Sequence, residues 1–167
     1  EMGIRGFLAA YDAKTGREIG KAEVAPTTSG YSITHAPLVI KDKVVVGVGG
    51  GEYGIRGFIA AYNVDTGKEV WRFYTIPGPG EKGHETWETC PPKSESFCDP
   101  DAWKHGGGSI WMTGSDDPPL HLPYWGGGKV GPDYARPPRP GDKPYSASLV
   151  APAAAQGTLP RHSPVTP

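Results

Sequence analysis

Residues 52–70 read Glu52-Tyr-Gly-Ile-Arg-Gly-Phe-Ile-Ala-Ala-Tyr-Asn-Val-Asp-Thr-Gly-Lys-Glu-Val70, and residues 1–19 carry a near copy, Glu1-Met-Gly-Ile-Arg-Gly-Phe-Leu-Ala-Ala-Tyr-Asp-Ala-Lys-Thr-Gly-Arg-Glu-Ile19. In the second copy, residues 57–62 predict a β-strand because they are mostly aromatic, β-branched and small apolar side chains. Asp65-Thr66-Gly67 supplies turn chemistry, with glycine where a positive φ is favoured. Residues 69–74 then predict the return strand, so each copy is predicted to form a β-hairpin.

The spacing of the two copies predicts an all-β fold made of repeated sheets. Glu52 corresponds to Glu1, which gives a period of roughly 50 residues, as found in the blades of β-propellers. Between the copies, residues 36–40 and 44–48 predict a further antiparallel pair around a polar turn. No stretch of the first hundred residues keeps a helical period, so we expect a partial propeller.

Composition limits the classes of partner and divides the chain in two. The formal net charge of -1 gives no general attraction to nucleic acid, and no apolar run is long enough to span a bilayer. Prolines are concentrated in the second half and interrupt β-ladders. We therefore expect residues 1–150 to form the propeller domain and residues 151–167 to be a degenerate, poorly ordered proline-rich tail.

The two cysteines, Cys90 and Cys98, lie in a loop rich in proline and serine. Their spacing is compatible with a small disulfide in an oxidising compartment, and the alternative is two free surface thiols. We expect a Cys90–Cys98 disulfide.

A Gly49-x-Gly51-x-x-Gly54 motif follows a predicted strand and has the spacing of a dinucleotide-binding loop. Such a loop must open a helix whose amino terminus meets the pyrophosphate. Residues 55–62 instead read as a β-strand, so we reject dinucleotide binding.

Four motifs in order resemble the PQQ-dependent (quinoprotein) alcohol dehydrogenases over about residues 30–150. They are Val46-Gly-Val-Gly-Gly-Gly-Glu52, Trp71-Arg-Phe-Tyr-Thr-Ile-Pro-Gly-Pro-Gly80, Asp101-Ala-Trp-Lys-His-Gly-Gly-Gly-Ser-Ile-Trp111 and Tyr124-Trp-Gly-Gly-Gly128. The resemblance implies a fragment of an eight-bladed propeller. In that family, the tryptophan that closes the Thr-Gly-Lys-Glu-x-Trp motif packs between neighbouring blades.

The resemblance also implies a site for pyrroloquinoline quinone (PQQ) and a metal ion, Ca²⁺ or a lanthanide. Glu52 would be the metal ligand, because a carboxylate is a hard oxygen donor. The implied cofactor-binding residues are Thr34, Gly50, Gly51, Ser109 and Trp111, with Trp111 flat against the quinone ring.

Three positions depart from the family pattern. Lys129 stands where the family usually has a metal-binding asparagine, and an ammonium group has no lone pair to offer a metal. Gly20 stands in the first copy where Trp71 stands in the second. The family's catalytic aspartate is expected beyond Pro167, so we assign no catalytic residue; Asp142 is read as part of a structural turn.

By resemblance, the complete protein would oxidise a small alcohol in the periplasm and pass electrons to a c-type cytochrome or a membrane quinone. We expect this chain to be inactive alone and to bind Ca²⁺ weakly, with Glu52 and Lys129 forming an ion pair. The alternative is a non-catalytic propeller scaffold or a decayed gene fragment, which Gly20, Lys129 and the proline-rich tail favour.

Overall fold

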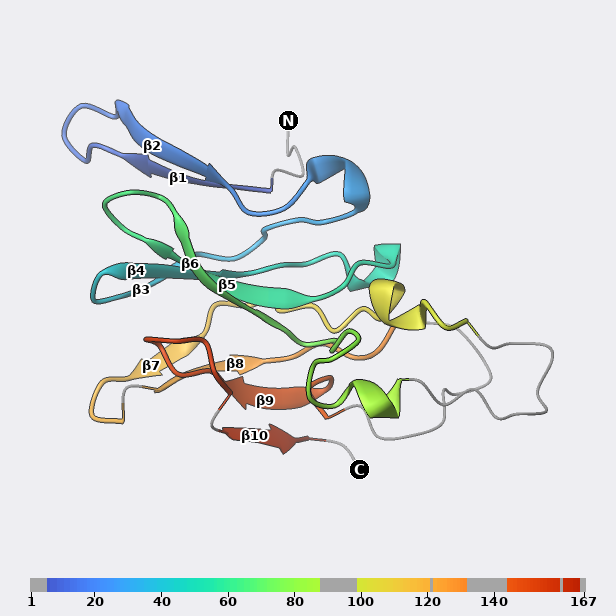
Figure 1. Cartoon of the computed structure of the whole chain (residues 1–167). Helices are drawn as coiled ribbons and strands as arrows, with labels where there is room; N and C mark the ends of the chain where they lie inside the picture. Colours follow the sequence, from blue (N-terminus) through green and yellow to red (C-terminus); the bar gives the residue numbers. More distant parts are fainter. Residues whose placement is uncertain (1–5, 88–98, 121, 132–143, 160, 166–167) are drawn as a thin grey trace, which may run out of the picture.

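The computed structural model describes residues 6–87, 99–120, 122–131, 144–159 and 161–165, and these are organised mainly by β-strands (Figure 1). The strands are β1 (Phe7–Tyr11), β2 (Glu18–Glu23), β3 (Leu38–Ile40), β4 (Lys43–Gly47), β5 (Phe58–Asn63), β6 (Glu69–Tyr74), β7 (Ser115–Asp117), β8 (Leu122–Gly126), β9 (Ser148–Ala151) and β10 (Arg161–Pro164). The helical segments within these ranges are single 3-10 turns, namely η1 (Thr27–Ser29), η2 (Gly51–Tyr53), η3 (His84–Thr86) and η4 (Ala102–His105). None of the described helical segments could cross a bilayer.

The strands form three antiparallel sheets that follow one another along the chain. The first pairs β1 with β2, the second has the order β3-β4-β5-β6, and the third has the order β10-β9-β8-β7. Figure 1 shows the sheets one after another, from β1 and β2 at the top to β10 at the bottom. Successive antiparallel sheets are the arrangement predicted for a partial propeller.

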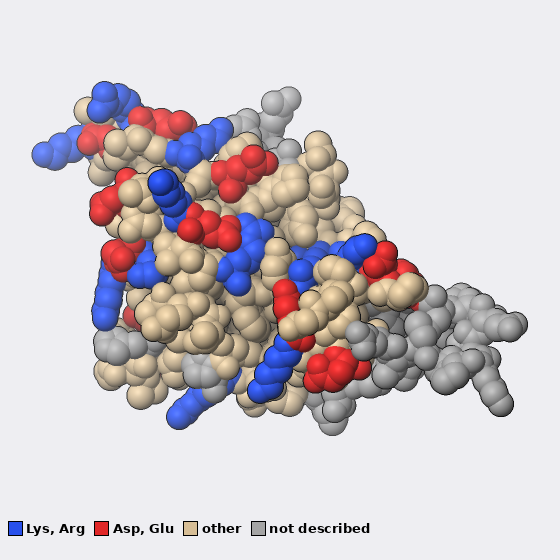
Figure 2. Space-filling model, in the orientation of Figure 1, with Lys and Arg blue, Asp and Glu red and all other residues tan. Residues whose placement is uncertain are grey.

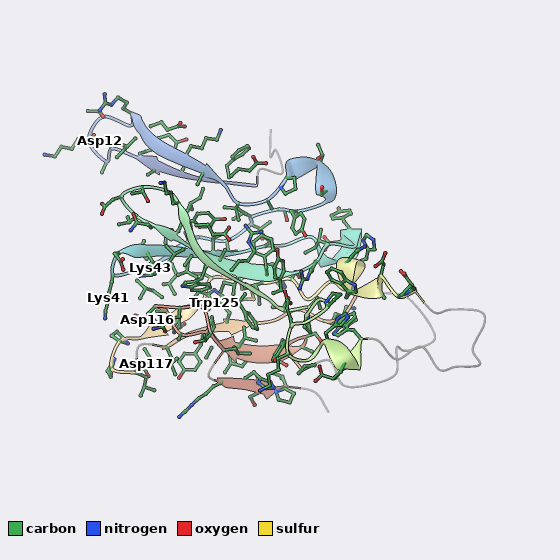
Figure 3. All side chains as sticks on the ribbon, viewed as in Figure 1. Asp12, Lys41, Lys43, Asp116, Asp117 and Trp125 are labelled. Carbon is green, nitrogen blue, oxygen red and sulfur yellow. The ribbon has the colours of Figure 1, made fainter. Side chains whose placement is uncertain are left out.

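The Thr-Gly turns close two equivalent hairpins, as the sequence predicts. The Asn63 side-chain oxygen accepts hydrogen bonds from the backbone N–H and the hydroxyl of Thr66, each at 2.9 Å. Asp12 accepts the same pair from Thr15, both at 2.7 Å, and Figure 3 shows Asp12 at the tip of the β1–β2 hairpin. Each local side-chain acceptor satisfies turn donors, which fixes where the strand reverses.

The neighbouring four-stranded sheets share one apolar core. Figure 3 shows Trp125 of β8 in the interior between them, and only 1% of its surface is exposed. Trp71 of β6 is 8% exposed and its indole N–H donates to the Ala154 carbonyl of the β9–β10 hairpin at 3.0 Å. The expected packing of this tryptophan between neighbouring blades is therefore present. The core residues around them are Ile40, Val45, Ile59, Ala61, Ile110, Tyr145 and Val150.

The expectation of a degenerate tail after residue 150 is wrong for the last hairpin. β10 pairs with β9 in register, with Arg161 opposite Ala151 and Pro164 opposite Ser148. β10 is the outermost strand of its sheet, and an edge strand tolerates proline because one side of its backbone needs no partner. Gly157, in the turn before β10, lies against the Trp71 ring, which ties this hairpin to the preceding sheet.

Charges of both signs are interspersed on the face shown in Figure 2. This agrees with the formal net charge of -1.

The central sheet meets the segment before β7 at a point where only glycine fits. The Gly57 N–H donates to the Gly107 carbonyl at 2.7 Å, and a Cβ atom on Gly57 would overlap the Gly108 carbonyl. We therefore expect Gly57→Ala to lower the free energy of unfolding by about 2–3 kcal/mol, the cost of forcing apart a packed interior. Urea unfolding followed by tryptophan fluorescence measures this change.

Gly20→Ala is the matched control, since nothing lies within 4 Å of the added methyl position. It should leave the unfolding midpoint close to that of the parent chain. Equal unfolding midpoints for Gly57→Ala and Gly20→Ala would show that the close approach of Gly57 to the Gly108 carbonyl is not required for stability.

Candidate functional site

Three glycine-rich segments meet beside the amino end of β5. The Gly108 N–H donates to the Lys129 carbonyl at 3.0 Å, and the Gly128 N–H donates to the Ser109 carbonyl at 2.7 Å. The Ile110 N–H donates to the Val48 carbonyl at 2.8 Å. These main-chain bonds hold the end of β4, the segment before β7 and the end of β8 in one arrangement.

The junction forms an open hollow of about 340 Å³, a volume suited to a small ligand. Its lining residues are Ser32, Thr34, Gly49, Gly50, Gly51, Glu52, Ser109, Trp111, Gly128 and Lys129. All six residues predicted to bind PQQ or metal belong to this set, although residues 34 and 111 are far apart in the sequence. The structure therefore brings the predicted site residues together.

Trp111 presents an aromatic surface that is not used in the core. It is 53% exposed, in contrast to the buried Trp125, and its backbone carbonyl accepts a hydrogen bond from the Thr34 hydroxyl at 3.3 Å. Ser109 is 9% exposed and lines the same hollow. An indole face can stack on a planar ring. Neighbouring hydroxyl groups can donate hydrogen bonds to polar substituents at the edge of that ring.

The glycines of the hollow allow main-chain groups to line it closely. Gly50 has a φ of 104°, a left-handed conformation, and directly precedes η2. A Cβ atom there would overlap the Gly30 carbonyl oxygen. Both features require glycine, and they place Glu52, one residue into η2, at the rim.

Glu52 and Lys129 are the two ionisable residues that line the hollow, and both are exposed. The ion pairs found between two described residues include Lys43 with Asp42, Arg56 with Glu81, Arg72 with Glu69 and Lys104 with Asp101. The expected Glu52–Lys129 ion pair is not among them, so that expectation is wrong at contact distance. Glu52 and Lys129 instead line the same hollow from different segments of the chain.

The described residues do not by themselves make a site for a hard metal cation. Ca²⁺ takes six to eight oxygen ligands, commonly from several carboxylates. Among the described residues, no group of three or more His, Cys, Asp and Glu side chains could hold a metal ion. One carboxylate and one lysine in a hollow of hydroxyl and glycine residues fit an organic ligand better than a metal.

Sequence reasoning missed Arg56, which fixes the segments behind the hollow. Its guanidinium group stacks 3.6 Å from the Tyr74 ring centroid and 4.8 Å from that of Trp103. It also donates to the Ile76 carbonyl at 2.8 Å and pairs with Glu81. The only signal in the sequence is that Gly-Ile-Arg-Gly occurs in both repeat copies.

Burial lowers the pKa of the Arg56 guanidinium from its ordinary value, and the Glu81 carboxylate opposes that change. Arg56 remains charged at neutral pH because the ordinary pKa of arginine is far above it. The Arg56 backbone also forms a β-bridge with Gly107. The same bridge therefore holds both the stacked side chain and the segment that borders the hollow.

The other predictions from the sequence concern the glycine motif of residues 49–54, the two cysteines and Asp142. The Gly49-x-Gly51-x-x-Gly54 motif leads into β5 and not into an α-helix, which confirms the rejection of dinucleotide binding. Cys90, Cys98 and Asp142 lie outside the described residues.

Residues 8–162 match the family described as the PQQ glucose/ethanol/alcohol dehydrogenase β-propeller domain. The chain belongs to this family. In sequence it is 42% identical to the quinohemoprotein alcohol dehydrogenase ADH IIB of Pseudomonas putida, over 98% of the chain and 24% of the relative. It is 38% identical to the lanthanide-dependent methanol dehydrogenase of Methylacidiphilum fumariolicum, over 89% of the chain and 25% of that relative.

Solved structures of the family have the same fold over this region. A europium-containing methanol dehydrogenase aligns with a TM-score of 0.80 and 36% identity, covering 98% of this chain and 30% of its own. The quinohemoprotein alcohol dehydrogenase of Comamonas testosteroni aligns with a TM-score of 0.76 and 34% identity, over 97% and 25%. The predicted partial PQQ-type propeller is thereby confirmed, and the chain spans about a quarter to a third of the relatives it matches.

The contacts of the Arg56 guanidinium group with the Tyr74 and Trp103 rings can be tested by a substitution that keeps the positive charge. Arg56→Lys removes the planar group between Tyr74 and Trp103, and we expect it to lower the free energy of unfolding by about 1–2 kcal/mol. Chemical denaturation measures the loss. Arg17→Lys, at an exposed hairpin end, is the control and should change stability little. An Arg56→Lys chain as stable as the parent would show that charge alone is needed there.

Proposed function

We propose that this chain forms the PQQ-binding part of the propeller of a quinoprotein alcohol dehydrogenase. The observation that supports this most strongly is the single hollow lined by Thr34, Gly50, Gly51, Ser109 and Trp111. The family match over residues 8–162 and the solved relatives support a PQQ-type propeller independently of the hollow's geometry.

PQQ is a planar conjugated quinone that bears carboxylates, and when bound it accepts the hydride removed from an alcohol. In this proposal Trp111 stacks on one face of the ring and excludes water from it. The Ser109 hydroxyl lines the hollow and can donate to an oxygen at the ring's edge. The Thr34 hydroxyl also lines it and would exchange its hydrogen bond to the Trp111 carbonyl for one to the ligand. The main chain at Gly50 and Gly51 approaches the ring because no side chain stands in the way.

The remainder of the activity belongs to the whole protein. We infer a small alcohol as substrate, a c-type cytochrome or a membrane quinone as electron acceptor, and a periplasmic location, all from the family. One relative is named as lanthanide-dependent and one solved relative as europium-containing, which supports a metal ion as a second cofactor of the whole protein. Glu52 is the residue this chain would offer to a Ca²⁺ or lanthanide ion, though the described donor set does not complete such a site.

We expect the isolated chain to bind the quinone without oxidising alcohols. No general base has been assigned among its described residues, and the stretch matched in its relatives is about a quarter of their length. The alternative is a non-catalytic scaffold or decayed fragment, in which the hollow would have lost its affinity for the quinone. Lys129 at the hollow is the feature that favours this alternative.

Binding of PQQ by Trp111 variants tests the proposal. We expect Trp111→Ala to weaken PQQ binding by roughly tenfold, equivalent to about 1.4 kcal/mol, because a stacking face is lost. Trp111→Phe should retain part of the affinity. Isothermal titration calorimetry measures both.

Met112→Ala is the matched control, since Met112 is adjacent and 57% exposed but does not line the hollow. PQQ affinity should be unchanged in that variant. A parent chain that fails to bind PQQ at all, with or without added metal, would support the scaffold alternative.

A further inference from the structure

Thr75 is a buried polar residue that lies outside the hollow. It directly follows β6, only 1% of its surface is exposed, and it is not one of the residues that line the hollow. A buried hydroxyl group needs a hydrogen-bond partner. The Thr75 hydroxyl donates to the carbonyl of Gly108, which is 33 residues away in the sequence. This bond joins the end of the second sheet to the segment that precedes β7.

Main-chain hydrogen bonds hold Thr75 in place beside that segment. Its N–H donates to the Gly57 carbonyl at 3.0 Å, and the Gly57 N–H donates to the Gly107 carbonyl at 2.7 Å. Gly107 and Gly108 both have a positive φ, of 74° and 62°. Because glycine has the widest choice of backbone conformations, a pair of glycines holds one conformation only when outside groups bind it. The Thr75 hydroxyl is such a group.

The bond from Thr75 orients the peptide unit that leads into the hollow. The Gly108 carbonyl and the Ser109 N–H belong to one planar unit, so fixing the carbonyl direction also constrains the Cα atom of Ser109. Ser109 lines the hollow, and Trp111 lines it two residues further along the same segment. The hydroxyl of Thr75 therefore acts on the wall of the hollow from behind.

No spare volume around Gly108 would let this peptide unit relax without the hydroxyl. Gly108 is buried, and a Cβ atom built on it would lie 2.8 Å from the Thr75 hydroxyl oxygen and 2.7 Å from the end of the Ile76 side chain. A buried carbonyl that loses its donor costs free energy, which favours a rotation of the peptide unit toward another donor. Such a rotation would move Ser109.

We propose that Thr75 is a positioning residue for quinone binding. Through the Gly108 carbonyl, its hydroxyl holds the Ser109 hydroxyl in the orientation that receives the edge of the planar quinone. The inference rests on the proposed function, because it concerns the same hollow. It assigns part of the quinone affinity to a side chain that does not line the site.

Thr75→Val tests this role because valine keeps the branched shape and removes the hydroxyl. We expect PQQ binding to weaken roughly tenfold, measured by isothermal titration calorimetry at a temperature where circular dichroism shows every variant folded. Thr75→Ser, which keeps a hydroxyl, should retain most of the affinity. Thr75→Ala also lacks the hydroxyl and takes the place of Thr75→Val if that variant does not fold.

A double-mutant cycle with Ser109→Ala distinguishes positioning from a general loss of structure. In the Ser109→Ala chain, removing the Thr75 hydroxyl should weaken PQQ binding by about twofold at most, because the group that Thr75 positions is already absent. The same fold-loss in both backgrounds would overturn the proposal.

Ile40→Val is the control for lost stability alone. Ile40 is buried in the core and pairs with Lys43 at the start of β4, whereas the hollow lies beyond the end of that strand. This variant should lower the unfolding midpoint and leave PQQ affinity unchanged.

The remaining outcomes separate this inference from the proposed function. Unchanged affinity of the hydroxyl-free variant, or an equal loss in Ile40→Val, would overturn the role of Thr75 and leave the proposed function standing. A parent chain that binds no PQQ, with or without Ca²⁺ or La³⁺, would overturn both.

Discussion

The site depends on a set of main-chain hydrogen bonds made by residues 106–110. The Gly107 N–H donates to the Ile55 carbonyl and the Gly107 carbonyl accepts from Gly57, which joins this segment to the start of β5. The next N–H, that of Gly108, donates to the carbonyl of Lys129, which follows β8 in the sequence. A segment bonded on one side to the second sheet and on the other to the third fixes both sheets relative to the hollow. Because buried main-chain polar groups need partners, this junction has few alternative arrangements.

The sequence predicts the hairpins well because their determinants are local. A side-chain acceptor at the start of the turn and a glycine with positive φ at its end decide where each strand reverses, as at Asn63 and Gly67. The grouping of the site residues is not local, since Thr34 and Trp111 meet only in the folded chain. It was predicted through the family resemblance, and neither composition nor periodicity could have supplied it.

The features that sequence reasoning missed depend on packing between distant segments. Pro164 suggests a broken ladder until β10 is known to be an edge strand. Arg56 looks like a surface residue in a repeat, and only the structure shows aromatic rings from β6 and η4 on its two sides. The expected contact between Glu52 and Lys129 followed from placing both at one site, yet lining a shared hollow does not fix the distance between two exposed side chains.

Three tryptophans show how the same side chain acquires different roles in this fold. Trp71 and Trp125 lie where two sheets face each other, and their rings are used to fill the space between them. Trp111 comes directly after Ile110, which is buried in that same core, but is itself 53% exposed and lines the hollow. The Ile110 N–H donates to the Val48 carbonyl at 2.8 Å, so the buried side chain and this main-chain bond fix the backbone from which the neighbouring indole extends. The core thus orients the aromatic surface of the hollow, and a site residue is positioned by a packing residue that never lines the site.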